Sequence, residues 1–334
     1  MRARSRIVPA VAEPEVSVVI PSHARRLRLR WLLNSLEEQA LDRSRFEVIV
    51  VHDYDDEDTR NVIERHPLAE AGVLHHIRIV PGTGHPARQR NLGWRAAEAP
   101  LVAFTDDDCR ADPHWLESYL AAAAQHPGAV IQGVTRNEPY EIETWAAPHV
   151  RTLDIPHPPN EFLQTCNILY PRELLERLNG FDESFEAPAG EDTDLGLRAA
   201  ESGAEIAGTY DAIVYHAVEE YTLPAMIKLG WKWRHVALLA RRHPRVRREW
   251  VLGFFWRREH AMLLAGGAGV VAARRFPPAA LAAVPYLREQ LTRRGTAKRQ
   301  LAVCALELPG QVAADAAEVA TMIAGSARYR TFVL

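Results

Sequence analysis

Cysteine is scarce in this 334-residue chain, which has Cys109, Cys166 and Cys304 far apart from one another. So sparse and odd a set provides neither a disulfide framework nor the paired spacing of a zinc site, and a reducing compartment is the simpler expectation. Long apolar runs are also missing, since the longest mostly apolar stretch, 260–273, is shorter than the roughly 20 residues that span a bilayer. Residues 1–15 contain no apolar run of signal-peptide length. We therefore expect a cytoplasmic protein.

Acidic and basic residues are unevenly distributed. The chain has 40 Lys and Arg against 43 Asp and Glu, a net charge of −3. Residues 225–300 hold 17 of the basic residues against three Glu and no Asp, so the remainder has 23 basic and 40 acidic residues. This division predicts that the two parts meet different partners. Apolar and charged contents of 47% and 25% are typical of a folded globular protein.

The first half alternates short apolar runs with helical patterns. These predict strands at 16–20, 46–51, 76–80, 101–105 and 129–134, and helices at 27–39, 58–65, 86–97 and 113–125. The order is typical of a parallel sheet with helices on both faces. Beyond it the sequence predicts a surface loop at 137–161, strands at 165–170, 205–209 and 212–215, and helices from residue 223 onward.

Polar segments follow the first, second and fourth predicted strands. They are Pro21-Ser22-His23, residues 52–56, and Asp106-Asp107-Asp108. Ligands of such sheets bind beyond the carboxyl ends of the strands, so all three segments are candidates for a site. The first of them has no glycine. This argues against a nucleotidyltransferase with a glycine-rich phosphate loop and against a dinucleotide-dependent oxidoreductase.

Three consecutive carboxylates directly after an apolar strand repel one another, and burying them is costly unless a cation compensates. Oxygen ligands of this kind suit Mg²⁺ or Mn²⁺, which bind one or two carboxylates together with substrate phosphates. A solvated acidic loop before the next helix is the alternative. The position of Asp106, Asp107 and Asp108 at the end of the fourth strand favours the metal site.

A second acidic motif, Gly190-Glu191-Asp192-Thr193-Asp194, begins a predicted helix. Carboxylates in the first turn of a helix stabilise it by capping and by interaction with its dipole. The functional alternative is a general base, because a carboxylate can take the proton of a hydroxyl that becomes a nucleophile.

The motifs VSVVIPS, VIVVHDYDDEDT, ARQRNLGWRAA, FTDDD and NGFDESF with GEDTDLGLR follow one another in this order. In this respect residues 15–216 resemble the family 2 glycosyltransferases. The resemblance implies an α/β GT-A fold, the nucleotide-diphospho-sugar transferase fold, with a Rossmann-like sheet between helices and here a C-terminal helical extension. It also implies contacts to the nucleotide-sugar. The residues at the matching positions are Pro21, Ser22, Asp53, Arg90, Asn91, Asp106 and Asp107.

The resemblance further implies a divalent cation, Mg²⁺ or Mn²⁺, held by Asp108 with Asp106 as its partner. His216 matches a histidine that lies near the metal in similar enzymes, and a purely structural histidine is the alternative. Asp192 matches the catalytic base, with Glu191 beside it. The implied reaction is an inverting, metal-assisted transfer of a sugar, of the hexosyltransferase class, to an acceptor hydroxyl. One departure is His52-Asp53-Tyr54-Asp55, where the family often has Asp-Asp-Gly-Ser.

A sugar-nucleotide-binding protein without transfer activity is the alternative function. The presence of Glu191 and Asp192 argues against it. The acceptor is a glycan, a lipid-linked molecule or a small molecule, and cell-envelope polysaccharide biosynthesis is the expected context.

Residues 1–14 are expected to form a tail, 15–220 the transferase domain and 221–334 a basic helical region. Within the last, residues 225–275 combine four tryptophans with many Lys and Arg. Such a segment can lie on an anionic membrane, which would make the protein peripheral on the inner face, or can form a solvated helical subdomain. No nucleic-acid motif accompanies the charge, so we expect no nucleic-acid partner.

Overall fold

A computed structural model describes residues 13–147 and 149–334. Contacts divide the chain into two compact units. The first comprises the residues up to Ile142 together with Thr152–Glu186 and Leu195–Val218, and the second comprises Glu143–Arg151, Ala187–Asp194 and Glu219–Leu334. The domain limits predicted from sequence stay predictions, because contact density does not test independent folding.

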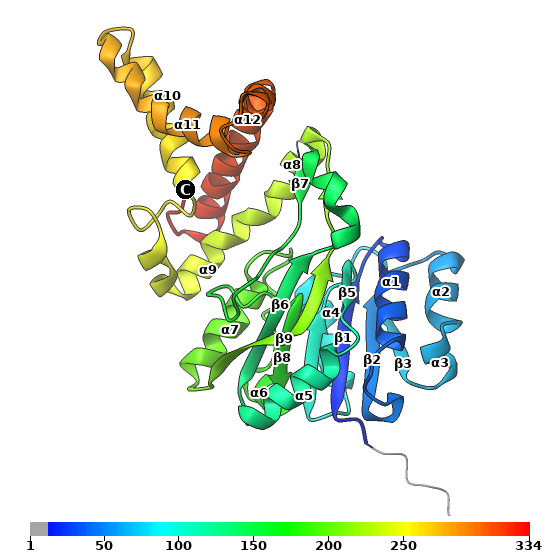
Figure 1. Cartoon of the computed structure of the whole chain (residues 1–334). Helices are drawn as coiled ribbons and strands as arrows, with labels where there is room; N and C mark the ends of the chain where they lie inside the picture. The colour runs from blue at the N-terminus through cyan, green and yellow to red at the C-terminus, as the bar shows by residue number, and fades with distance from the viewer. Residues whose placement is uncertain (1–12, 148) are drawn as a thin grey trace, which may run out of the picture. The chain divides into compact units, whose positions relative to one another are not determined.

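The first unit contains an eight-stranded sheet in the order β3-β2-β1-β4-β8-β6-β9-β5 (Figure 1). Its strands are β1 (Val16–Ser22), β2 (Phe46–His52), β3 (Leu74–Arg78), β4 (Leu101–Thr105), β5 (Cys109–Ala111), β6 (Val130–Asn137), β8 (Asn167–Pro171) and β9 (Ile206–His216). The first four lie parallel, as the sequence predicts, and their order in the sheet is β3-β2-β1-β4. Beyond them the sheet is mixed, because β8, for which the sequence predicts no direction, runs antiparallel to both β4 and β6, and β6 therefore runs the same way as β4.

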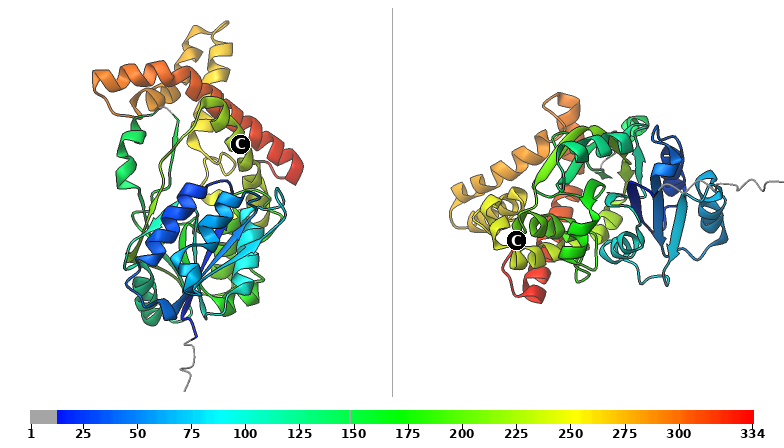
Figure 2. Two further views of the ribbon diagram at one scale, coloured as in Figure 1. Left: turned by 90° about the vertical axis from the view of Figure 1, so that its right-hand side faces the viewer. Right: turned by 90° about the horizontal axis from the view of Figure 1, so that it is seen from below.

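Helices cover both faces of this sheet, which confirms the predicted GT-A layering (Figures 1 and 2). They are α1 (Arg26–Glu37), α2 (Glu57–Glu64), α3 (Pro67–Glu70), α4 (Pro86–Ala96), α5 (Trp115–Gln125), α6 (Arg172–Leu178) and α7 (Glu191–Glu201).

Each face of the sheet has its own apolar core. Val16, Val18 and Ile20 of β1 pack in one cluster with leucines of α1, whereas Val19 packs in the other cluster with Trp94 of α4. Successive side chains of a strand point to opposite faces, so a strand buried on both sides reads as an unbroken apolar run. This is why β1 is apolar from Val16 to Pro21 except at Ser17, which donates to Glu47 of β2.

The second unit is mostly helical. Its helices are α8 (Leu223–Gly230), α9 (Val236–Arg242), α10 (Arg258–Ala272), α11 (Val284–Thr292) and α12 (Lys298–Tyr329), with 3-10 turns η3 (Trp231–His235), η4 (Pro244–Glu249) and η5 (Pro277–Ala283). The left view of Figure 2 shows α12 bent along its length, and Pro309 inside it removes a backbone donor. In the described part of the chain, no helix is both long and apolar enough to cross a membrane.

Two segments differ from the local predictions. The predicted surface loop at 137–161 contains the 3-10 segment η2 (Pro139–Ala146) and a short strand, β7 (Val150–Arg151), which pairs with β10 (Glu219–Glu220) in the second unit. The two strands predicted at 205–209 and 212–215 are one strand, β9. Its register against β6 shifts between Gly133 and Val134, which accommodates the polar residues between the two apolar runs.

Candidate functional site

The carboxyl ends of β1, β2 and β4 lie side by side and carry the predicted polar residues. β1 lies between the other two, so Ser22 at its end adjoins the segments after β2 and β4. The buried Gln89 of α4 donates to the carbonyl oxygens of Ser22 (3.0 Å) and Val51 (3.1 Å) and holds these two strand ends together. The helical pattern around residues 86–97 gave no reason to single out Gln89.

Asp107 is the anchored member of the acidic triplet. Its Oδ2 accepts from Ser22 Oγ at 2.7 Å and from the His23 backbone N–H at 3.1 Å, and its Oδ1 accepts from Arg25 Nη1 at 3.2 Å. Burial and the neighbouring Asp108 raise the pKa of Asp107 to about 7, although Arg25 and the hydrogen bonds oppose the rise. Asp107 therefore ties the end of β1 to the end of β4.

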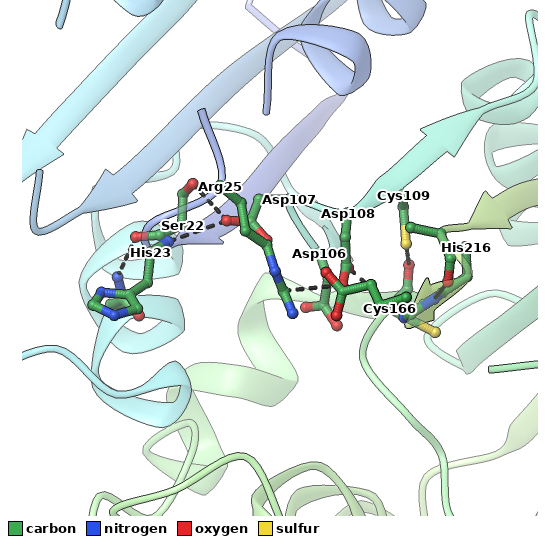
Figure 3. A network of polar contacts seen from close by, with 12 residues as sticks. Ser22, His23, Arg25, Asp106, Asp107, Asp108, Cys109, Cys166 and His216 are labelled. Atoms are coloured by element: carbon green, nitrogen blue, oxygen red, sulfur yellow. Dashed lines mark hydrogen bonds and ion pairs between the residues drawn. The ribbon is translucent and has the colours of Figure 1, made fainter. Parts of the chain in front are cut away.

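One carboxylate oxygen of Asp108 accepts no hydrogen bond from the described residues. Its Oδ2 lies 2.9 Å from Arg25 Nη1, whereas its buried Oδ1 has no hydrogen-bond partner among the described residues. Figure 3 shows Arg25 reaching toward Asp107 and Asp108. A buried carboxylate oxygen without a donor is costly, and a cation is one of the few groups that can compensate it.

His216 at the end of β9 faces this free oxygen. Its Nε2 lies 3.7 Å from Asp108 Oδ1, and its Nδ1 donates to the Ala217 carbonyl oxygen at 2.9 Å. Because a carbonyl can only accept, Nδ1 carries a proton, and in the neutral form of the ring the Nε2 lone pair would point to Asp108. This is the tautomer that a metal-binding histidine needs.

Strand pairing sets the distance between Asp108 and His216. Cys109 of β5 pairs with His216 of β9, and the Ala217 N–H donates to the Asp108 carbonyl oxygen at 2.9 Å. Cys109 lies close enough to complete a group of three potential ligands. Burial, Cys166 and the carboxylates raise the pKa of its thiol well above the usual value, and a protonated thiol is a weak ligand. Asp108 and His216 therefore fit a hard divalent cation.

Asp106 is paired with Arg90 of α4, whose Nη2 lies 2.7 Å from Asp106 Oδ1. Burial alone would raise the pKa of Asp106, but Arg90, His216 and Arg25 outweigh it and hold the pKa below its usual value. The guanidinium of Arg90 also lies over the ring of Phe181, 5.7 Å from its centroid. Arg90 and an ionised Asp106 therefore form an ion pair at the end of β4.

Asp53 lies after β2 and accepts from the ring of His23 (2.7 Å) and from the Gly82 backbone N–H (3.2 Å). His52, before it, is buried and in contact with His76, Nε2 to Nδ1 at 3.1 Å. The hydroxyl of Tyr54 lies 2.8 Å from Ser22 Oγ and accepts from the Arg25 N–H. The segment His52-Asp53-Tyr54, which departs from the Asp-Asp-Gly-Ser of the family, thus has structural contacts for each of its three side chains.

Asn91, the residue after Arg90 in α4, is bonded to protein groups. Its Nδ2 donates to the Phe181 carbonyl and to Glu183, and its Oδ1 accepts from the Phe181 N–H and from Trp94. Asn91 thus holds the turn at Gly180 and Phe181. A contact between Asn91 and a nucleotide stays a prediction.

A cavity of about 350 Å³ adjoins Asp108. Trp31, Tyr140 and Tyr215 contribute aromatic faces to it, and Arg110 pairs with Glu138 on its wall, Nε to Oε2 at 2.9 Å. Aromatic faces with a few fixed polar groups suit a hydroxyl-rich ligand.

The predicted residues fall into two sets. Ser22, Asp53, Arg90, Asp106, Asp107, Asp108 and His216 come together in the first unit, with Pro21 in β1 behind Ser22. Glu191 and Asp192 belong to the second unit and open α7. There Asp192 Oδ1 accepts from the Thr193 N–H at 2.8 Å, and Glu191 is buried.

Comparisons with known proteins find similar glycosyltransferases. Residues 17–178 match the family model described as Glycosyl transferase family 2. Over these residues, slightly less than half of its length, the chain is similar to the family 2 glycosyl transferases. Validoxylamine A glucosyltransferase of Streptomyces hygroscopicus subsp. jinggangensis is 30% identical over 218 residues, which cover 55% of this chain and 51% of the relative. Pre-mycofactocin glycosyltransferase of Mycobacterium tuberculosis is 29% identical, over 69% of this chain and 48% of its own.

Solved structures share the fold of this chain. Mannosyltransferase PcManGT of Pyrobaculum calidifontis, in complex with GDP-Man and Mn²⁺, is similar with a TM-score of 0.57 and 20% identity, over 94% of this chain and 87% of that one. TarS 1-349 of S. aureus in complex with UDP-GlcNAc has a TM-score of 0.52 and 17% identity, over 95% and 91%. The chain spans about half the length of the curated relatives that it matches.

Proposed function

We propose that this chain transfers a sugar from a nucleotide-diphosphate donor to an acceptor hydroxyl with inversion and with the help of a divalent cation. The observation that carries the proposal is the buried, unbonded Oδ1 of Asp108 facing the Nε2 of His216 at 3.7 Å. Asp108 and His216 would hold the cation, with Asp106 as the partner ligand. Mg²⁺ or Mn²⁺ would offset the charge on the leaving diphosphate when bound. Mn²⁺ in the mannosyltransferase complex supports this choice.

The donor would occupy the strand ends. Asp53 would offer a carboxylate to the nucleobase of the donor. Pro21 and Ser22 would border the donor at the end of β1. Arg90 presents its charge beside Asp106 for the diphosphate, and Asn91 and Asp107 complete the proposed contacts. UDP-GlcNAc in TarS and GDP-Man in the mannosyltransferase support a nucleotide-sugar, and both donor classes belong in a test.

Asp192, with Glu191 beside it, is the proposed base. Its carboxylate would take the proton of the acceptor hydroxyl as the hydroxyl oxygen bonds to the anomeric carbon and the diphosphate leaves. No covalent bond between sugar and protein is needed. The alternative is a protein that binds a nucleotide-sugar without transferring the sugar. A working general base distinguishes the transferase from this binding protein.

The acceptor and the cellular place complete the proposal. A glycan, a lipid-linked molecule or a small molecule would accept a hexose, in the biosynthesis of a cell-envelope polysaccharide. The excess of Lys and Arg in 225–300 supports a peripheral position on the cytoplasmic face of an anionic membrane.

A thermal-shift and hydrolysis screen tests the donor and the metal. UDP- and GDP-sugars are each offered with Mn²⁺, Mg²⁺ or a chelator. We expect one donor class to stabilise the protein only with metal, and Asp108→Asn to abolish that shift. Asp211→Asn, which changes an exposed carboxylate of β9, is the matched control. Equal shifts with chelator and with metal would contradict the cation site.

The base has its own test. Asp192→Asn should abolish transfer, while the metal-dependent shift with the donor remains. Turnover at the wild-type rate in this variant would exclude Asp192 as the base. Donor binding without transfer in the wild-type protein, across a broad set of acceptors, would favour the binding-protein alternative.

A further inference from the structure

A helical hairpin in the second unit has almost no charge. Residues 261–287 run from α10 through η5 into α11, and their only charged residues are Arg274 and Arg275. Figure 1 shows the chain leaving along α10 and returning toward α11. A hairpin of this composition on a protein surface calls for an explanation, because exposed helices normally carry charges on their outer side.

The two arms pack through small residues. A Cβ on Gly269 would lie 2.4 Å from the Ala279 carbonyl oxygen and 2.7 Å from the Ala282 Cβ, and one on Gly266 would lie 3.1 Å from the Ala283 Cα. The close approach uses glycine and alanine, so the larger apolar side chains point outward. The exposed ones are Leu264 (40%), Val270 (57%), Val271 (64%), Phe276 (63%), Leu281 (69%), Val284 (51%) and Leu287 (38%).

The base of the hairpin is anchored, whereas its turn is not. Near the base, Arg258 pairs with Glu289, and Tyr286 donates to the buried Asp315 of α12 at 2.7 Å. At the turn, Arg274 and Arg275 are exposed and form no ion pair with any described residue. The fold thus presents an apolar surface with two unneutralised positive charges in its middle.

Three of the four tryptophans of the basic segment pack internally, and the fourth, Trp231, is half exposed in η3, outside the hairpin. Trp233, Trp250 and Trp256 pack against the small core of the second unit around Val236 and Met322, and the rings of Trp233 and Trp256 lie 4.8 Å apart. These three tryptophans are therefore used for internal packing. The outward apolar residues lie further along the chain.

We propose that the hairpin 261–287 is the surface by which this chain adsorbs to an anionic membrane, which rests on the peripheral position in the proposed function. Each arm has roughly a dozen residues and extends about 20 Å, short of the ~30 Å hydrocarbon core. Contact at the lipid interface suits it, with the outward Val, Leu and Phe at the acyl boundary and Arg274 and Arg275 at the phosphates.

Co-sedimentation of the full chain with lipid vesicles tests the proposal. We expect binding to phosphatidylcholine vesicles with 30 mol% phosphatidylglycerol and little binding to pure phosphatidylcholine. Removing both charges in Arg274→Gln/Arg275→Gln should weaken binding roughly thirtyfold. The matched control is Lys298→Gln/Arg299→Gln, which removes two exposed charges of α12 away from the hairpin.

Two further variants test the contribution of the exposed apolar side chains to vesicle binding. Val271→Asp/Leu281→Asp should abolish vesicle binding, whereas Leu306→Asp, at an exposed leucine of α12, should not. Equal binding of the hairpin variants and the wild type would overturn the proposal. So would a dimer in solution that Val271→Asp/Leu281→Asp dissociates, because a second copy of the chain would then cover the hairpin.

Activity separates this inference from the proposed transfer. Metal-dependent hydrolysis of the donor in solution should be the same in the hairpin variants and the wild type. Vesicle binding without any donor activity would leave the hairpin as a membrane contact and would refute the transferase proposal. Donor activity without vesicle binding would refute the membrane contact and would leave the transferase proposal in place.

Discussion

His243 Nε2 lies 3.0 Å from Asp194 Oδ1, and both side chains are buried. Asp194 is in the first turn of α7, and His243 follows α9. Arg242 adds a second, longer contact at 3.8 Å to the same oxygen. The turn that carries Glu191 and Asp192 is thus bonded to a helix end of the same unit.

His243→Ala should therefore lower the stability of the second unit. Removing one partner of a buried pair leaves Asp194 poorly compensated, and we expect a loss of about 2–3 kcal/mol in the free energy of unfolding, measured with urea. His114→Ala, at an exposed histidine paired with an exposed Glu117, is the matched control and should be nearly neutral. The same denaturation midpoint for both variants would show that the buried contact contributes no stability.

A second prediction concerns Arg25, which lies beside the proposed cation site. Its Nη1 lies 3.2 Å from Asp107 and 2.9 Å from Asp108, so its charge occupies the neighbourhood where a cation would bind. Arg25→Gln should increase the affinity of the protein for Mn²⁺ without nucleotide by about tenfold, because roughly 1.4 kcal/mol of repulsion is removed.

Calorimetric titration with Mn²⁺ measures this change. Arg26→Gln, which breaks an exposed ion pair between the first residue of α1 and Asp58 of α2, is the control and should leave the affinity within about twofold. Weaker Mn²⁺ binding by Arg25→Gln would mean that Arg25 organises the carboxylates rather than competing with the cation.

The parallel part of the sheet was predictable because burial on both faces leaves an unmistakable apolar run in β1, β2 and β4. The direction of β8 was not. The apolar residues of 167–171 would suit a buried strand running in either direction. Its direction in the sheet is set by the segments that connect it and by its pairing with β4 and β6. The register shift in β9 was missed because its polar middle resembles a turn.

The residues of the candidate site were also predictable only in part from the sequence. Asp106, Asp107 and Asp108 could be found because consecutive carboxylates after an apolar strand need an explanation. The nearness of Asp108 and His216 depends on β5, whose short extent gives no periodic signal. Arg25 and Gln89 act through contacts distant in sequence, and only a family resemblance could have pointed to such residues.

The pH dependence of stability should contain a component from His52. Burial, followed by the nearby His76 and Arg78, lowers the pKa of His52 from 6.5 to about 4. The unfolded chain therefore binds more protons between these values, so the component is fully present above pH 6.5 and is lost as the pH falls toward 4. The loss approaches about 3 kcal/mol at the lower limit.

His52→Asn removes this titration. Urea unfolding at pH 7 and pH 4.5 should show a smaller fall in stability for this variant than for the wild type. His126→Asn is the control, since His126 is exposed beside Glu205. The same pH dependence for wild type and His52→Asn would show that His52 titrates normally in the folded protein.

Two glycines in helices should respond oppositely to alanine. A Cβ on Gly93 of α4 would lie 2.4 Å from Val19 Cγ1 and 3.3 Å from Val51 Cγ2, so Gly93→Ala pushes α4 away from β1 and β2 and should cost about 1–3 kcal/mol. Gly267 of α10 has nothing within 4 Å of the added carbon. Gly267→Ala should therefore stabilise α10 by up to about 1 kcal/mol through helix propensity. Urea unfolding of both variants measures the two effects, and a stability gain in Gly93→Ala would contradict the tight contact between α4 and β1.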